Sequence, residues 1–105
     1  MITSFREYQN KAVSFAIYPA TDKVLYPTLG LCGEAGEVAD KVKKQVRDGV
    51  FNRHEVAKEL GDVLWYLANL ANDIGYNLDE IADMNIEKLT SRQARNKIKG
   101  SGDNR

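Results

Sequence analysis

The sequence predicts an all-α fold, an antiparallel four-helix bundle, from three observations. Apolar residues recur at three- and four-residue intervals in four separate segments, which is typical of helices that bury one face. A capping-box signature, a small polar residue followed three positions later by glutamate, precedes three of these segments. No strand pattern, internal repeat or linker competes. We therefore expect a single domain over residues 1–99 and a polar C-terminal tail over 100–105.

The first expected helix begins after Ser4, which forms a capping box with Glu7, and it ends near Pro19. Its apolar positions are Phe5, Tyr8, Ala12, Phe15 and Ala16. After a short loop, the second helix has Pro27 in its first turn and stops at Gly49. Its apolar positions are Leu31, Ala35, Val38, Val42 and Val46.

The third expected helix starts from a capping box at Asn52 and ends at Gly75. Its apolar stripe consists of Val56, Leu60, Val63, Leu64, Leu67 and Leu70. The fourth helix starts from a capping box at Asn77 and runs toward Arg92 or beyond. This helix carries apolar residues on more than one side, at Leu78, Ile81, Met84, Ile86 and Leu89. Because one chain can cover only one such side, we expect oligomerisation to complete the bundle, as a homodimer or a dimer of dimers.

Composition limits the classes of partner. The 105 residues include fifteen basic and fifteen acidic side chains, so the formal charge is zero and gives no footprint for bulk nucleic acid or a membrane surface. The apolar runs are too short to span a bilayer and the first residues lack a signal-peptide pattern, so we expect a cytoplasmic protein. With one cysteine and one histidine, the chain offers neither an internal disulfide nor a zinc ligand set.

Two pairs of carboxylates carry the chemistry. Glu34 and Glu37 lie in the second expected helix, and Glu59 and Asp62 lie in the third. Residues three apart share a helix face, and like charges at this spacing repel. Clustered carboxylates without histidine or cysteine are the oxygen-donor sites that Mg²⁺ prefers, and Mn²⁺ can substitute. The pattern therefore predicts a divalent-cation site.

For that site to form, the two pairs must lie at the same height along two neighbouring helices. The short connection near Gly49 favours antiparallel neighbours. At about 1.5 Å rise per residue, the first pair lies roughly 19 Å before the end of its helix and the second roughly 11 Å after the start of its own. Because these two distances differ, the pairs can meet only in one of three ways. The second expected helix ends early, the loop runs back along the helices before the third begins, or the two helices cross at an angle. Gly30, Gly33 and Gly36 form a smooth strip beside the first pair, suited to close packing or ligand approach.

The ordered pattern Glu-x-x-Glu, twenty-one intervening residues and Glu-x-x-Asp resembles the signature of the all-α nucleoside triphosphate pyrophosphohydrolases, in particular their MazG-like branch. The resemblance extends to the segments LGLCGEAGEVAD (29–40) and ELGDVLWY (59–66), and to the ending SRQAR (91–95) and GSGDNR (100–105). It implies a MazG-like fold and Mg²⁺-dependent hydrolysis of a nucleoside triphosphate, with deoxy or non-standard nucleotides as candidates, between the α and β phosphates. The products are a monophosphate and pyrophosphate.

By this resemblance, Glu34, Glu37, Glu59 and Asp62 are catalytic metal ligands, and either Glu34 or Glu37 instead activates the attacking water. A triphosphate needs cations, because four bare carboxylates repel it. The resemblance also makes Lys88 and Arg92 candidates for gripping the triphosphate, with Arg95 and Asn85 nearby on the same expected helix. Basic residues in a last helical turn are favoured by the helix dipole without any ligand, which is the structural alternative.

Other classes of protein share part of this pattern. A di-iron bundle would need Glu-x-x-His on two helices, and neither pair ends in histidine. A catalytically silent metal- or nucleotide-binding module, or a helical interaction module, would keep much the same residues and stays the alternative to an enzyme. Among enzymes, phosphoribosyl-ATP pyrophosphohydrolases and dimeric all-α dUTP hydrolases share the acidic pattern.

Overall fold

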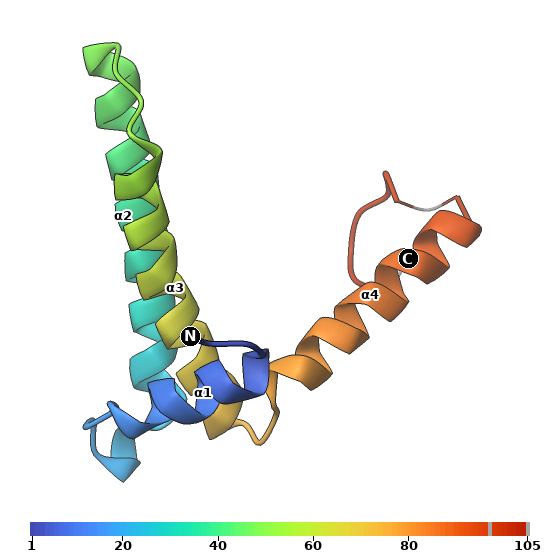
Figure 1. Ribbon diagram of the computed structural model, residues 1–105. Helices are drawn as coiled ribbons and strands as arrows, with labels where there is room; N and C mark the ends of the chain where they lie inside the picture. The colour runs from blue at the N-terminus through green and yellow to red at the C-terminus, as the bar shows by residue number, and fades with distance from the viewer. Residues whose placement is uncertain (97, 105) are drawn as a thin grey trace.

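The computed structural model describes residues 1–96 and 98–104, and every regular element in this part of the chain is helical (Figure 1). The elements are α1 (Phe5–Ser14), the short 3-10 helix η1 (Ala20–Asp22), α2 (Leu25–Asp48), α3 (Arg53–Asp73) and α4 (Leu78–Ala94). The predicted all-α fold with four helices is confirmed. Arg105, the last residue of the predicted tail, lies outside the described residues.

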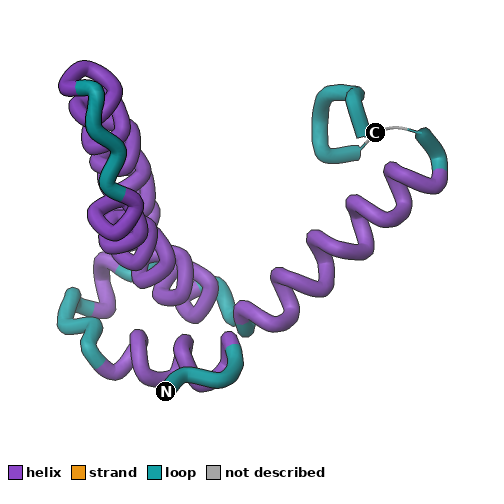
Figure 2. Tube along the Cα trace, turned by 45° about the horizontal axis from the view of Figure 1, so that its top comes forward, coloured by secondary structure: helices purple, strands orange, loops and turns teal. Residues whose placement is uncertain are grey.

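The helices are arranged as a long antiparallel pair with two further helices at one end. α2 and α3 run side by side, and α1 crosses the end of the pair at which α3 finishes (Figures 1 and 2). α4 contacts α1 and then points away from the pair, because the connection 74–77 turns the chain outward at Gly75, where φ is 87°. Within one chain the fourth helix therefore lies apart from the α2–α3 pair. Across the described residues, no helix combines the length and apolar character that a membrane crossing requires.

Side-chain caps explain why the helices begin where the sequence predicts. Ser4 Oγ accepts a hydrogen bond from the Glu7 N–H at 3.1 Å at the start of α1. Asn52 Oδ1 accepts two N–H groups of the first turn of α3, at 3.1 and 3.2 Å. At the start of α4, Glu80 Oε1 accepts from the Asn77 N–H at 2.9 Å. Each bond satisfies a backbone group that has no partner inside its helix, so these three boundaries are locally encoded.

The loop between α2 and α3 brings the two acidic pairs level. Gly49 ends α2 with φ of 72°, and the chain then runs back beside the helices (Figure 1). Gln45 Oε1 accepts from the Asn52 N–H at 2.9 Å, and Gln45 Nε2 donates to the Asn52 carbonyl at 3.3 Å. From this shared level, Glu34 lies eleven residues back along α2 and Asp62 lies ten residues onward along α3. Of the three expected solutions, the loop that climbs back is therefore the one observed.

A buried glutamine joins three elements near the end of α3. Gln9 of α1 is 3% exposed and lies by the small core of Ala12, Ala68, Ala71 and Leu78. Its Nε2 donates to the carbonyls of Ala68 and Tyr76 at 3.3 and 3.0 Å, and its Oε1 accepts from the Leu78 N–H at 2.9 Å. One side chain thus links α1 to the end of α3 and the start of α4, and it sets the direction in which α4 leaves.

Replacing Gln9 with alanine is expected to lower the free energy of unfolding by about 2–3 kcal/mol, because the buried Leu78 N–H loses its acceptor and the Ala68 and Tyr76 carbonyls lose a donor. Urea unfolding followed by circular dichroism measures the change. Gln93→Ala is the matched control, since Gln93 is exposed on α4 and its substitution should stay within about 0.5 kcal/mol of the parent. Equal effects from the two substitutions would contradict the linking role of Gln9.

A carboxylate at the end of α3 holds the chain where α2 begins. Asp73 Oδ2 accepts from the Tyr18 hydroxyl and from the Val24 N–H, both at 2.9 Å. Val24 has φ of 69° and ψ of −54°, and the Leu25 N–H donates to the Lys23 carbonyl at 2.8 Å across it. A β-branched residue rarely adopts positive φ, so the Asp73 bonds stabilise a strained turn. This turn starts α2 two residues before Pro27.

The pKa of Tyr18 is raised to about 12 by burial, by its hydrogen bond to Asp73 and by the charge of that carboxylate. The folded-state pKa lies above the unfolded value of about 10. The contribution of Tyr18 to stability is therefore complete below pH 10 and is lost as the pH rises toward 12. Titration of absorbance at 295 nm, with Tyr18→Phe subtracted, should show the Tyr18 component near pH 12. A component near pH 10 would rule out the bond to Asp73 in solution.

Candidate metal centre

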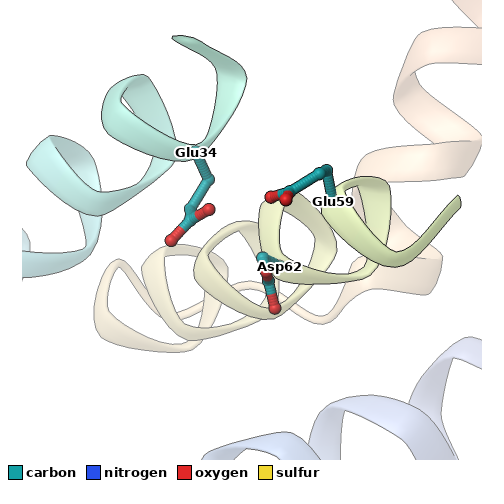
Figure 3. A group of neighbouring side chains, drawn as sticks. All are labelled: Glu34, Glu59 and Asp62. Atoms are coloured by element: carbon teal, nitrogen blue, oxygen red, sulfur yellow. The ribbon is translucent and has the colours of Figure 1, made fainter. Parts of the chain in front are cut away.

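Three of the four predicted carboxylates converge between α2 and α3. Glu34 comes from α2, and Glu59 and Asp62 come from α3 (Figure 3). One carboxylate oxygen from each lies within 4.8 Å of the others. Glu34 and Glu59 are half-buried and Asp62 is exposed. Glu37, three residues further along α2, is exposed and lies outside this group of three.

The electrostatics of the group disfavour three bare charges. Burial raises the pKa of Glu34, and the charges of Asp62, Glu59 and Glu37 raise it further. A cation between the oxygens would reverse these effects. Around an octahedral Mg²⁺, adjacent oxygens are about 3.0 Å apart and opposite ones about 4.2 Å apart, so the three side chains would have to close in on such an ion by changing rotamer. The donor set, carboxylate oxygens alone, is also the kind that Mg²⁺ and Mn²⁺ prefer.

A further acid on α3, Glu55, lies near the group of three, and Lys41 contacts both Glu55 and Glu59. Its Nζ lies 3.9 Å from Glu55 Oε2 and 3.9 Å from Glu59 Oε1, and Glu55 also pairs with Lys58 at 3.8 Å. Glu55 is therefore neutralised by two lysines, although it lies one turn before Glu59. Because Lys41 crosses from α2 to α3, it also ties the two helices together beside the acids.

The glycines of α2 divide into two kinds. A Cβ added to Gly30 would overlap the ring of Tyr66 on α3, whereas Cβ atoms added to Gly33 or Gly36 would meet nothing within 4 Å. Gly30 thus serves the close packing of α2 on α3, and Gly33 and Gly36 leave open space beside Glu34. Both expectations for the glycine strip, close packing and room for a ligand, fit the structure at different positions.

Gly30→Ala is expected to lower the free energy of unfolding by about 1–3 kcal/mol, because the Tyr66 ring must move. Gly36→Ala is the matched substitution in the same helix, and it should raise stability by up to about 1 kcal/mol because alanine favours a helix and open space receives its methyl group. Thermal unfolding of both variants measures the difference. Shifts of the same sign would show that Gly30 does not pack against Tyr66.

The predicted phosphate-binding residues all lie on or just after α4. Asn85 is exposed, Lys88 is half-buried and Arg92 is buried. Arg95 follows the last turn, where its Nε donates to Ser91 Oγ at 3.0 Å. Because α4 points away from the α2–α3 pair, these side chains and the acids are not brought together within one chain (Figure 1).

Sequence reasoning missed the residue that contacts this basic group. Asp103, in the predicted tail, lies 3.1 Å from Lys88 Nζ through its Oδ1, and its carbonyl accepts from Arg92 Nη2 at 2.6 Å. The segment around Asp103 contributed to the family resemblance, but it is rich in small and polar residues and has no periodic pattern, so its sequence did not indicate a contact with Lys88 and Arg92.

Comparison with known proteins gives two matches. A family profile described as "MazG nucleotide pyrophosphohydrolase domain" matches residues 25–96. The Gene 37 protein of Mycobacterium phage L5 is 48% identical over 109 residues, which cover 93% of this chain and 96% of that protein. No solved structure gives a significant match. The span of the family match contains both acidic pairs and the basic residues of α4.

Proposed function

The chain belongs to the MazG nucleotide pyrophosphohydrolase domain family, and on that premise we propose that it hydrolyses nucleoside triphosphates, deoxy or non-standard ones included, in a Mg²⁺-dependent reaction. Water adds across the anhydride between the α and β phosphates, and the products are a nucleoside monophosphate and pyrophosphate. The observation that carries the proposal is the convergence of Glu34, Glu59 and Asp62 from two helices within 4.8 Å. The charges of such a group oppose one another, and a bound cation would offset that repulsion.

Each acid has a distinct part in this proposal. Glu34, Glu59 and Asp62 hold the metal, and bound Mg²⁺ would supply positive charge for the phosphate oxygens. Glu37 lies on the same helix as Glu34 but outside the group of three, so it is the better placed of the two candidates to take a proton from the attacking water. The open space at Gly33 and Gly36 gives a phosphate chain access to Glu34.

The basic half of the site comes from a second copy of the chain in this proposal. Lys88 and Arg92 do not reach the acids of their own chain, because α4 points away from them. α4 also exposes large apolar side chains at Met84, Ile86 and Leu89, which are 55, 61 and 39% exposed. Covering such residues favours association. A homodimer or dimer of dimers would bury them and bring Lys88, Arg92 and their neighbours to the partner's acids.

Product analysis tests the reaction. The purified chain is incubated with standard, deoxy and modified nucleoside triphosphates, with and without Mg²⁺, and the products are separated by ion-exchange chromatography. The proposal expects monophosphate and pyrophosphate in equal amounts, and only with the metal present. Release of inorganic phosphate would contradict the assigned bond. Metal-dependent nucleotide binding without any product would favour a binding module instead.

A further inference from the structure

The end of the described chain folds back onto α4. Residues 100–104, which we call the return segment, pass beside the last turns of the helix (Figure 1). Lys88 Nζ donates to Asp103 Oδ1 at 3.1 Å. Arg92 Nη2 donates to the carbonyls of Asp103 and Gly102 at 2.6 and 3.3 Å, and it lies 3.6 Å from Asp103 Oδ1. Two cations of α4 are thus held by one acidic residue and the carbonyl next to it.

Arg92 is buried, and its hydrogen-bonding groups are not all paired. It is 4% exposed, although its neighbours Ser91 and Gln93 on α4 are exposed. Its Nε is buried and has no hydrogen-bond partner within the described residues. A guanidinium presents Nε and a terminal nitrogen side by side, and this fork matches two oxygens of one phosphate or carboxylate. The return segment satisfies the terminal nitrogen with carbonyls and leaves Nε unpaired, so a better ligand for Arg92 is a tetrahedral or planar oxyanion.

The return segment offers Lys88 and Arg92 the same kind of groups as an oxyanion does, a negative charge and oxygen acceptors. The hydrogen bond and charge of Lys88, together with Arg92, lower the pKa of the Asp103 carboxyl, so it stays ionised. Gly102 has φ of 83°, a conformation that L side chains rarely adopt, and this turn directs two successive carbonyls at Arg92. The segment therefore supplies a negative charge and two acceptors where an anion would bind.

We propose that the return segment is an intramolecular competitor for the phosphate-binding residues of α4, with Asp103 in the place of a substrate phosphate. The inference rests on the proposed function for the assignment of Lys88 and Arg92 to phosphate. While the segment is closed, neither cation is available in full, so apparent phosphate affinity is reduced by the fraction of molecules that are closed. Release of the segment opens the site, and phosphate then takes the Nε that the segment leaves unpaired.

Binding of inorganic tripolyphosphate, measured by isothermal titration calorimetry on the full chain with Mg²⁺ present, tests the proposal. Asp103→Asn is expected to tighten binding about threefold to tenfold, because it removes the competing charge and so raises the fraction of molecules in which the segment is released. Asn104→Ala is the matched control and should leave affinity unchanged. The Asp103 side chain is 83% exposed, so its substitution does not disturb the core. Unchanged or weaker binding in Asp103→Asn would overturn the proposal.

A double-mutant cycle separates competition from a general charge effect. If Asp103 acts through Lys88 as well as Arg92, the gain from Asp103→Asn should become clearly smaller in a Lys88→Ala background, where only the contact with Arg92 remains. An equal gain in both backgrounds would overturn the contact as its cause. The result is also independent of catalysis. Tighter tripolyphosphate binding without nucleotide hydrolysis would uphold the competitor and refute the proposed reaction, whereas hydrolysis with no gain in Asp103→Asn would do the reverse.

Discussion

Replacing Glu34 with glutamine is expected to reduce nucleotide turnover by at least about a hundredfold and at the same time to stabilise the metal-free protein. Both effects have one cause. Glu34 lies in the group of three carboxylates, and burial and the charges of Asp62, Glu59 and Glu37 raise its pKa. A raised folded-state pKa means that ionisation of Glu34 opposes folding, and this cost is fully present at neutral pH. Glutamine keeps the shape without the charge.

The stabilisation should be a few tenths of a kcal/mol up to about 1 kcal/mol, or up to about 5 °C in Tm. Glu34 is more informative than Glu59 here, because Glu59 lies near Lys41 and its substitution would also remove that contact. Turnover falls because the metal loses a ligand, and loss of one such charged interaction in a transition state commonly costs a factor of a hundred or more.

Differential scanning fluorimetry with and without MgCl₂ measures the stability, and pyrophosphate release measures turnover. In the parent protein, Mg²⁺ should raise Tm by relieving the repulsion. In Glu34→Gln that increase should disappear, while Tm without metal rises. Glu87→Gln on the exposed face of α4 is the matched control and should change neither quantity. A variant that keeps the Mg²⁺-dependent increase would refute the metal assignment of Glu34.

The helix boundaries that the sequence predicts correctly are those encoded by near neighbours. Ser4, Asn52 and Asn77 each start a helix through hydrogen bonds that span no more than three residues. Pro27 lies in the first turn of α2 as predicted, but the exact start at Leu25 depends on Asp73, far along the chain, which holds Val24 in a positive-φ turn. Such a contact has no local pattern, so periodicity and capping rules could not find it.

The site divides in the same way. The placement of acids on two helices follows from their spacing, and in the structure Glu34, Glu59 and Asp62 converge whereas the fourth predicted ligand, Glu37, lies outside their group. That these acids lie at the same height along α2 and α3 depends on the loop between the two helices running back beside them, which was one of three alternatives open from the sequence. The direction of α4 depends on the hydrogen bonds of Gln9 to distant backbone groups. The contact of Lys88 with Asp103 depends on a C-terminal segment whose sequence has no periodic pattern. Contacts between distant segments thus decide which predicted site residues meet.

Two inactive variants are expected to restore activity when they are mixed, because each active site would draw its acids from one chain and its bases from another. Glu59→Gln removes a metal ligand, and Lys88→Ala removes a phosphate-binding cation. In a mixed dimer, the intact acids of the Lys88→Ala chain meet the intact Lys88 of the Glu59→Gln chain. With free exchange of equal amounts, half of the dimers are mixed and each has one complete site, so about a quarter of parental activity should return.

The experiment mixes the two variants after reversible dissociation in urea and follows pyrophosphate release over time. Glu59→Gln mixed with Asp62→Asn is the control, since both changes damage the acidic half and no combination of these chains contains a complete site. If both pairs of variants stay inactive, Lys88 would have to act on the acids of its own chain, and α4 would have to swing back toward the α2–α3 pair. Because that movement must break the bonds between Gln9 and the start of α4, the parent and Gln9→Ala would then differ in activity as well as in stability.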